Sequence, residues 1–283
     1  MRRSRDGSGL LKLCRFDADR LGVVDGPFVR DVTPVLERLP AQRWPAPPGD
    51  ALVSQLAGLR PWIEAASAAA PAIELERVTL RSPVANPGKV IAVRSNYRGT
   101  EADDAGATPP GPELFLKAAS SVAGAGDGLR LRLPGRRVDH EVELVAVVGQ
   151  RVDGPTQARQ QGVVAGYCIG IDVTMRGPED RGLRKSFDGF TLLGPWLTTA
   201  DEIADPASLE VELSVNGELR QRGNTARLVH GISALLAAAA SYFTLQPGDI
   251  LMTGTPPGVG PLERGDEVSC LIDRLGILHV EVR

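Results

Sequence analysis

Two glutamates, Glu141 and Glu143, lie two positions apart at the start of an apolar stretch, which reads E-V-E-L-V-A-V-V-G. Side chains alternate across a β-strand, so both carboxylates are predicted to project from one face. Two such anions on a buried strand would repel each other and lose hydration, unless their face is solvated or they share a cation. Taken alone, this stretch favours a solvated face.

A third carboxylate changes that balance. Asp172 ends the apolar run G-V-V-A-G-Y-C-I-G-I-D, which is predicted to be another strand. Three carboxylates without a histidine or cysteine are the oxygen ligands that Mg²⁺ or Mn²⁺ prefers, and they make zinc a weaker candidate. The sequence therefore predicts one divalent cation held by the two glutamates and Asp172.

Composition and cysteine content limit the classes of function. The 283-residue chain is 42% hydrophobic and 24% charged, with a formal net charge of −3, which is typical of a soluble globular protein and not of one that binds nucleic acid. No stretch reaches the ~18 apolar residues of a membrane-spanning helix, so no membrane partner is expected. Cys14, Cys168 and Cys270 fit neither a disulfide framework nor a zinc site, and buried thiols in a reducing cytoplasm are expected.

Many short strands and few helices are predicted to position these groups, so we expect a mainly β fold with some α. Asp25-Gly26 and Asn216-Gly217 are typical hairpin turns. Helices are predicted over residues 50–70, with a kink or break at Pro61, and over residues 232–243. Punctuation by prolines favours a boundary near residue 80. The two predicted domains are a small N-terminal domain, residues 1–80, and a catalytic domain, residues 81–283.

The ordered motifs of the chain resemble those of the fumarylacetoacetate hydrolase family. The similarity runs from about residue 88 to the C-terminus and is carried by D-H-E-V-E-L, G-Y-C-I-G-I-D-V-T-M-R, K-S-F-D-G-F-T-L-L-G-P-W, V-N-G-E-L-R-Q, G-N-T and L-Q-P-G-D-I-L-M-T-G-T-P-P-G-V-G. The resemblance implies a mixed β-sandwich roll, usually a homodimer, with Mg²⁺ or Mn²⁺ on the three carboxylates. It also implies an enzyme that cleaves a C–C bond of a 2-oxo or 2,4-dioxo acid of the acylpyruvate type, through a metal-stabilised enolate.

The same resemblance implies roles for further residues. Arg176 would clamp a substrate carboxylate or an oxyanion, although a structural ion pair would also explain it. Lys185 would stabilise developing negative charge. Glu179 stands where the family often has a glutamine that holds a water or oxyanion, and it could pair with Arg176 or Arg184. The residues implied to contact the substrate are Tyr97, Gly254, Thr255 and again Arg176.

The chain departs from the family at its catalytic histidine. The family's N-Y-x-x-H-x-x-E corresponds here to N-Y-R-G-T-E-A-D, so Thr100 replaces the histidine and Asp103 the glutamate. Threonine cannot act as a general base near neutral pH, whereas Asp103 or Glu101 could if its pKa were raised. Residues 97–112 are predicted to form a lid. Hydrolysis is therefore predicted to be slow unless one of these carboxylates is the base.

Three alternatives follow from that departure and from the carboxylates. The chain could be an isomerase, hydratase or decarboxylase of an unsaturated 2-oxo acid, because those reactions depend less on water attack. It could also be a catalytically impaired protein that keeps the fold and the cation. A glycosidase is disfavoured because its two carboxylates must flank a bond across a cleft, and neighbours on one strand do not.

Overall fold

The computed structural model describes residues 11–98 and 111–283, and within these residues the largest sheet has 12 strands. The strands along its main path are, in spatial order, β4 (Ala72–Glu74), β3 (Phe28–Asp31), β2 (Arg20–Asp25), β1 (Lys12–Phe16), β13 (Thr191–Thr199), β11 (Val164–Asp172), β10 (Val142–Val148), β16 (Ile250–Met252), β6 (Val90–Val93) and β7 (Leu114–Lys117). Beside this path, β5 (Leu80–Arg81) pairs with β1, and β8 (Val122–Gly124) pairs with β13.

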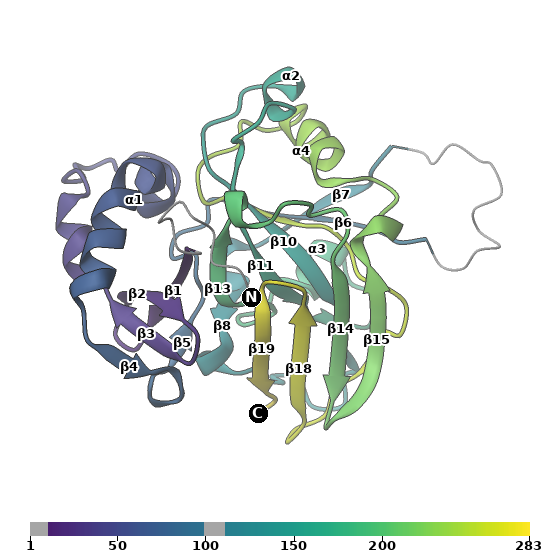
Figure 1. Cartoon of the computed structure of the whole chain (residues 1–283). Helices are drawn as coiled ribbons and strands as arrows, with labels where there is room; N and C mark the ends of the chain where they lie inside the picture. The colour runs from purple at the N-terminus through teal and green to yellow at the C-terminus, as the bar shows by residue number, and fades with distance from the viewer. Residues whose placement is uncertain (1–10, 99–110) are drawn as a thin grey trace.

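Two smaller sheets and a few helices complete the fold (Figure 1). The four-stranded sheet has the order β15 (Glu218–Asn224), β14 (Glu210–Val215), β18 (Glu267–Ile272) and β19 (Gly276–Glu281). The three-stranded sheet has the order β12 (Thr174–Met175), β9 (Val138–His140) and β17 (Gly260–Pro261). The α-helices are α1 (Ala51–Ala69), α2 (Pro155–Ala158), α3 (Arg181–Arg184) and α4 (Ile232–Ala240). The prediction of a mainly β chain with some α is confirmed.

The central strand β10 is covered on both faces. Leu144 and Ala146 belong to a core shared with the four-stranded sheet and α4, whereas Val145 and Val147 belong to a second core that includes α1. A strand buried on both faces reads as a continuous apolar run, which explains its sequence. Because side chains alternate, Glu143 points to the same side as Val145 and is itself buried.

The helix α1 forms as one element, and Pro61 lies inside it without breaking it. The Asp50 side chain caps the helix by accepting a hydrogen bond from the Val53 N–H at 3.1 Å. Buried side chains lie on both sides of the proline, including Leu56 and Ile63. Packing of this apolar face stabilises the helix through the position where Pro61 removes a backbone hydrogen bond.

The hairpin turns and the N-terminal strands show how the sheets are connected. Asn216 and Gly217 have φ values of 53° and 78°, and Gly26 has a φ of 59°, so both predicted hairpin turns are confirmed. The strand β1 pairs antiparallel with β13, and the N-terminal strands therefore continue the largest sheet (Figure 1). The predicted division of the chain near residue 80 stays a prediction.

In the described part of the chain, no helix combines the length and apolar character needed to cross a membrane.

Candidate active site

The three predicted carboxylates meet because of the register between β10 and β11. Glu143 pairs with Gly170, and one step along the ladder the Asp172 N–H donates to the Glu141 carbonyl at 2.8 Å. Ligand oxygens of Glu141, Glu143 and Asp172 all lie within 4.8 Å of one another. This spacing is near the roughly 4.2 Å that separates opposite ligands of a Mg²⁺ ion bound at about 2.1 Å. The geometry and the all-oxygen donor set of this acidic triad fit a small divalent cation.

Glu141 itself lies at a change of sheet and not inside the predicted strand. The strand β9 ends at His140 in the three-stranded sheet, and β10 begins at Val142 in the largest sheet. The Glu141 side chain is 13% exposed, whereas that of Asp172 is 2% exposed. Glu143 is also 2% exposed. The burial of Glu143 and Asp172 overturns the interpretation of the glutamates as a solvated face.

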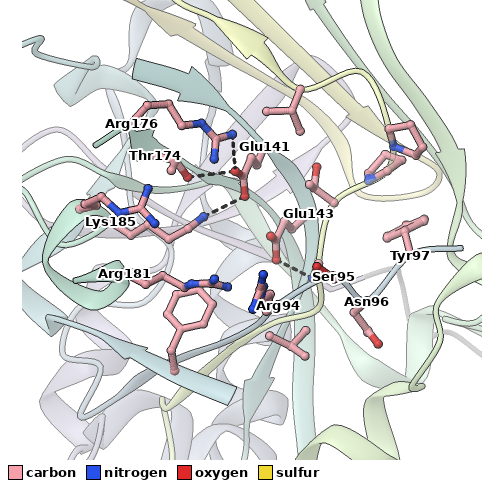
Figure 2. Close-up of a pocket in the computed structure, with 18 residues that line it drawn as sticks. Arg94, Ser95, Asn96, Tyr97, Glu141, Glu143, Thr174, Arg176, Arg181 and Lys185 are labelled. Carbon is pink, nitrogen blue, oxygen red and sulfur yellow. Dashed lines mark hydrogen bonds and ion pairs between the residues drawn. The ribbon is translucent and has the colours of Figure 1, made fainter. Parts of the chain in front are cut away.

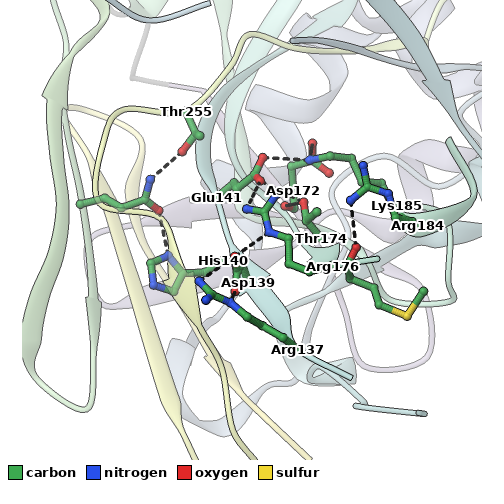
Figure 3. Close-up of polar contacts among 12 residues, drawn as sticks. Arg137, Asp139, His140, Glu141, Asp172, Thr174, Arg176, Arg184, Lys185 and Thr255 are labelled. Carbon is green, nitrogen blue, oxygen red and sulfur yellow. Dashed lines mark hydrogen bonds and ion pairs between the residues drawn. The ribbon is translucent and has the colours of Figure 1, made fainter. Parts of the chain in front are cut away.

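Two lysines pair with two of the three carboxylates, Glu141 and Asp172. The Lys185 Nζ donates to Glu141 at 2.8 Å and to Asp172 at 2.7 Å (Figure 3). The Nζ of Lys117, a fully buried residue at the end of β7, donates to Asp172 at 2.5 Å and to the Phe190 carbonyl at 2.9 Å. Burial opposes the ionisation of Asp172, but the two ammonium groups outweigh it and hold the pKa of that carboxyl below its usual value. Lys117 was not predicted from the sequence, where its only signal is the end of the apolar run L-F-L-K.

Glu143 experiences the opposite effect. Burial, and then the nearby Asp172 carboxylate, raise the pKa of Glu143 well above its usual value. The Gly254 N–H donates to the Glu143 carboxylate at 2.7 Å. Burial and the charge of Glu143 also raise the pKa of Tyr97, whose buried hydroxyl has no hydrogen-bond partner among the described residues. A cation and a polar ligand would complete these contacts.

Arg176 takes part in the site and in a structural ion pair at once. Its Nε donates to Asp139 at 2.6 Å, and its Nη2 donates to Glu141 at 3.3 Å (Figure 3). The Thr174 hydroxyl donates to the same oxygen of Glu141 at 3.0 Å. Both predicted interpretations of Arg176 are therefore compatible with its position.

Glu179 lies outside the acidic triad and pairs with Arg136. Its carboxylate accepts two hydrogen bonds of 2.8 Å from Arg136, and these bonds lower the pKa of Glu179 to about 2. Its side chain pairs with neither Arg176 nor Arg184, although the Arg184 Nε donates to its backbone carbonyl at 2.9 Å. Glu179 is not among the described residues that line the pocket, and its predicted catalytic role stays a prediction.

A buried glutamine orients Thr255. The Gln221 Nε2 donates to the Thr255 hydroxyl at 2.7 Å and to the Pro256 carbonyl at 2.7 Å. The Gln221 Oε1 lies 2.9 Å from the His140 Nδ1 and accepts a hydrogen bond from the Val142 N–H. Because the Thr255 oxygen is already an acceptor, its own proton is free to reach a ligand in the pocket. His140 thus has a structural partner in Gln221.

These groups surround one pocket of about 470 Å³ (Figure 2). Of the predicted site residues, those that line it are Tyr97, Glu141, Glu143, Arg176, Lys185, Gly254 and Thr255. Asp172 stands behind them, bound to the two lysines. Asp103, together with Thr100 and Glu101, lies outside the described residues. The lining residues that sequence reasoning missed include Arg94, Phe115 and Arg181.

The chain is similar to known proteins over most of its length. Residues 89–283 match the family described as fumarylacetoacetate (FAA) hydrolase C-terminal. The chain is 47% identical over 285 residues to a maleylpyruvate hydrolase of Aquipseudomonas alcaligenes, covering 96% of this chain and 99% of that protein. It is 39% identical over 226 residues to an oxaloacetate tautomerase of Rattus norvegicus, covering 76% and 72%. The crystal structure of maleylpyruvate hydrolase from Sphingobium sp. SYK-6 in complex with manganese(II) ion and pyruvate superposes with a TM-score of 0.82, at 40% identity over 96% of this chain and 98% of that one.

Proposed function

Because this chain belongs to the fumarylacetoacetate hydrolase family, we propose that it hydrolyses maleylpyruvate, a 2,4-dioxo acid, to maleate and pyruvate. Membership of the family confirms the predicted fold class and the predicted class of enzyme, a metal-dependent hydrolase or lyase acting on 2-oxo or 2,4-dioxo acids. Tautomerisation of oxaloacetate is the second candidate, and it has less support because that relative is less similar over a smaller part of the chain.

The observation that carries the proposal is a buried acidic triad at the base of a pocket that contains several cationic side chains. When bound there, a divalent cation would supply Lewis-acid activation of a 2-oxo carboxylate. Glu141, Glu143 and Asp172 would hold it. Lys185 and Arg176 would place positive charge where negative charge develops during cleavage.

The reaction needs water to add to the C4 carbonyl, after which the C3–C4 bond breaks. Maleate leaves, and the three-carbon fragment leaves as an enolate that takes up a proton to become pyruvate. Tyr97, Thr255 and the Gly254 backbone would orient the substrate at the pocket wall. A base must take the proton from water and return a proton to the enolate carbon.

Sequence supplies the candidates for that base. No histidine occurs among the described residues that line the pocket. Asp103 is the first candidate, because it occupies the position of the family's dyad glutamate, and Glu101 is the second. We expect Asp103→Asn to lower kcat for maleylpyruvate by about 10²–10⁴-fold, the usual contribution of a positioned general base. If only Glu101→Gln has that effect, Glu101 is the base.

We extend the proposal to the cation, the assembly and the location. Mn²⁺ is supported by the manganese in the related crystal structure, and Mg²⁺ by the all-oxygen ligands. The resemblance to the family supports a homodimer. Three free, buried cysteines are compatible with a reducing cytoplasm.

The experiment that tests the function uses the purified full chain, stripped with EDTA and reloaded with Mn²⁺ or Mg²⁺. Loss of the ultraviolet absorbance of maleylpyruvate is followed together with pyruvate release, and oxaloacetate tautomerisation is measured on the same preparation. We expect metal-dependent release of one pyruvate per maleylpyruvate. Metal-dependent tautomerisation without pyruvate release would favour the second candidate and overturn the first.

A further inference from the structure

Among the residues that the structure describes, one cationic side chain of the pocket makes no hydrogen bond or ion pair to a protein oxygen. The basic residues that line it are Arg94, Arg176, Arg181, Arg184 and Lys185. Arg94 pairs with Glu113, and the Arg184 guanidinium donates to backbone carbonyls. Arg176 and Lys185 bind carboxylates of the site. Within the residues that the structure describes, the Arg181 guanidinium makes neither a hydrogen bond nor an ion pair, and it lies over the aromatic ring of Phe115.

The acidic residues next to Arg181 in the chain bind other groups. Glu179 pairs with Arg136, as described above. The Asp180 carboxylate caps α3 by accepting a hydrogen bond from the Leu183 N–H at 3.3 Å. Neither carboxylate therefore neutralises Arg181, although both precede it directly in the sequence. The fold leaves a half-buried cation at the pocket wall without an anionic partner among the described residues.

Phe115 relates Arg181 to the acidic triad. Its ring centroid lies 5.6 Å from the Arg181 Cζ and 5.7 Å from the Lys185 Nζ. Arg181 is therefore close to the lysine that binds the triad without contacting the triad itself, and Figure 2 shows its guanidinium directed into the pocket. Packing against an aromatic face orients a guanidinium while its N–H groups stay available in the plane.

We propose that Arg181 binds the second carboxylate of the substrate, the one farthest from the 2-oxo acid end. This inference rests on the proposed function, in which the 2-oxo acid end occupies the triad, Lys185 and Arg176. The maleyl part of maleylpyruvate carries a carboxylate at the opposite end of the carbon chain. A planar guanidinium with free donors is the group best suited to bind such a carboxylate by two hydrogen bonds. Arg181 would thus select dioxo acids that carry two carboxylates.

The first test compares two substrates with the same reacting carbonyl groups. Maleylpyruvate has the distal carboxylate, and acetylpyruvate has a methyl group in place of that arm. We expect Arg181→Gln to lower kcat/KM for maleylpyruvate by roughly 10–100-fold, the usual effect of losing a hydrogen bond to a charged group, and to change it less than threefold for acetylpyruvate. Arg132→Gln, which removes an exposed arginine paired with Asp188, is the matched control and should alter neither value.

A second test measures binding and needs no turnover. Calorimetry of the Mn²⁺-loaded protein compares 2-oxoadipate with 2-oxohexanoate, which have the same length and differ in the terminal carboxylate. Wild type should bind 2-oxoadipate at least tenfold more tightly, and Arg181→Gln should abolish that preference. Arg181→Lys should keep part of it, because the charge remains and the paired hydrogen bonds do not.

The outcomes separate the two proposals. Arg181→Gln could instead lower the activity on both substrates equally, or leave the preference for 2-oxoadipate intact. In either case Arg181 does not bind the distal carboxylate and this inference is wrong, whereas the proposed hydrolase activity is unaffected. In another outcome, wild type cleaves neither dioxo acid but binds 2-oxoadipate preferentially, and Arg181→Gln loses that preference. The carboxylate-binding role of Arg181 is then supported, and the proposed hydrolysis is wrong.

Discussion

At the scale of single residues, Lys117 is the more deeply buried of the two lysines that contact the acidic triad. Its ammonium is fully buried and contacts the Oδ1 of Asp172, whereas Lys185 contacts the Oδ2. Without Lys117, only Lys185 would balance the buried Asp172 carboxylate, and loss of a partner from a buried ion pair costs far more than loss of an exposed pair. Lys117 therefore affects the stability of the protein as well as the site.

We predict that Lys117→Met lowers the free energy of unfolding of the metal-free protein by about 3–5 kcal/mol. The measurement is urea denaturation in EDTA. Arg132→Met breaks the exposed pair with Asp188 and serves as the control, with an expected change of at most about 1 kcal/mol. Equal small changes in both variants would show that Lys117 does not neutralise Asp172.

The metal site gives a second prediction at this scale. Glu143→Gln should weaken Mn²⁺ binding at least tenfold, because it removes one of the three carboxylates proposed to hold the cation. Calorimetry of EDTA-stripped protein measures this, with Glu218→Gln on the exposed hairpin as the control. In wild type, Mn²⁺ at a hundredfold excess over its Kd should add about 2.7 kcal/mol to the free energy of unfolding and raise the Tm. Unchanged affinity in Glu143→Gln would place the cation elsewhere.

At the scale of elements, the loop after β16 shapes the site through its backbone. Gly254 has a φ of +97°, and a Cβ there would come within 2.9 Å of the Asn96 Cβ. Its N–H is the donor to Glu143. The Asn96 side chain in turn bonds to the Thr253 and His230 carbonyls. A left-handed backbone and a tight contact are both required to aim this donor.

We predict that Gly254→Ala lowers both the free energy of unfolding and the affinity for Mn²⁺. The reason is that the added methyl group must displace the loop and with it the N–H that contacts Glu143. Gly217→Ala is the matched control, because its φ is +78° and no atom lies within 4 Å of the added Cβ. The control should cost about 1–3 kcal/mol of backbone strain and leave Mn²⁺ affinity unchanged. Equal effects on affinity would show that the loop does not orient Glu143.

At the scale of the whole molecule, every cysteine lies inside one of the cores. Cys14, Cys168 and Cys270 are all unpaired and buried. Burial raises the pKa of Cys14 and of Cys168 to about 12. Raised pKa values mean that little thiolate exists near pH 8, and burial also blocks access by reagents.

We therefore predict that the native protein reacts very slowly with Ellman's reagent at pH 8, and that three thiols react in guanidinium chloride. The time course of absorbance of the released thiolate measures both. All three cysteines are unpaired, so dithiothreitol should leave the Tm unchanged. Rapid reaction of even one thiol in the native state would show that a core opens or that the fold exposes that cysteine.

Local sequence determined much of this protein. Residue type and order predicted the hairpin turn at Asn216-Gly217, the helix after Asp50 and three carboxylates as candidate cation ligands. Turn conformation and helix capping depend on groups within a few positions, and the preference of a cation for oxygen depends on residue type. The same local view failed at Glu141, where the chain leaves one sheet for another.

Only the tertiary structure decided how the triad is neutralised and what else lines its pocket. Lys117 reaches Asp172 across 55 positions of the chain, and Arg181 rests on Phe115. The same holds for the register that sets Asp172 opposite Glu141. Such contacts depend on strand pairing and burial over long separations, which the propensities of neighbouring residues do not encode. The sequence does not show whether a charged side chain is solvated, paired or free to bind a ligand, because only its surroundings in the fold distinguish these states.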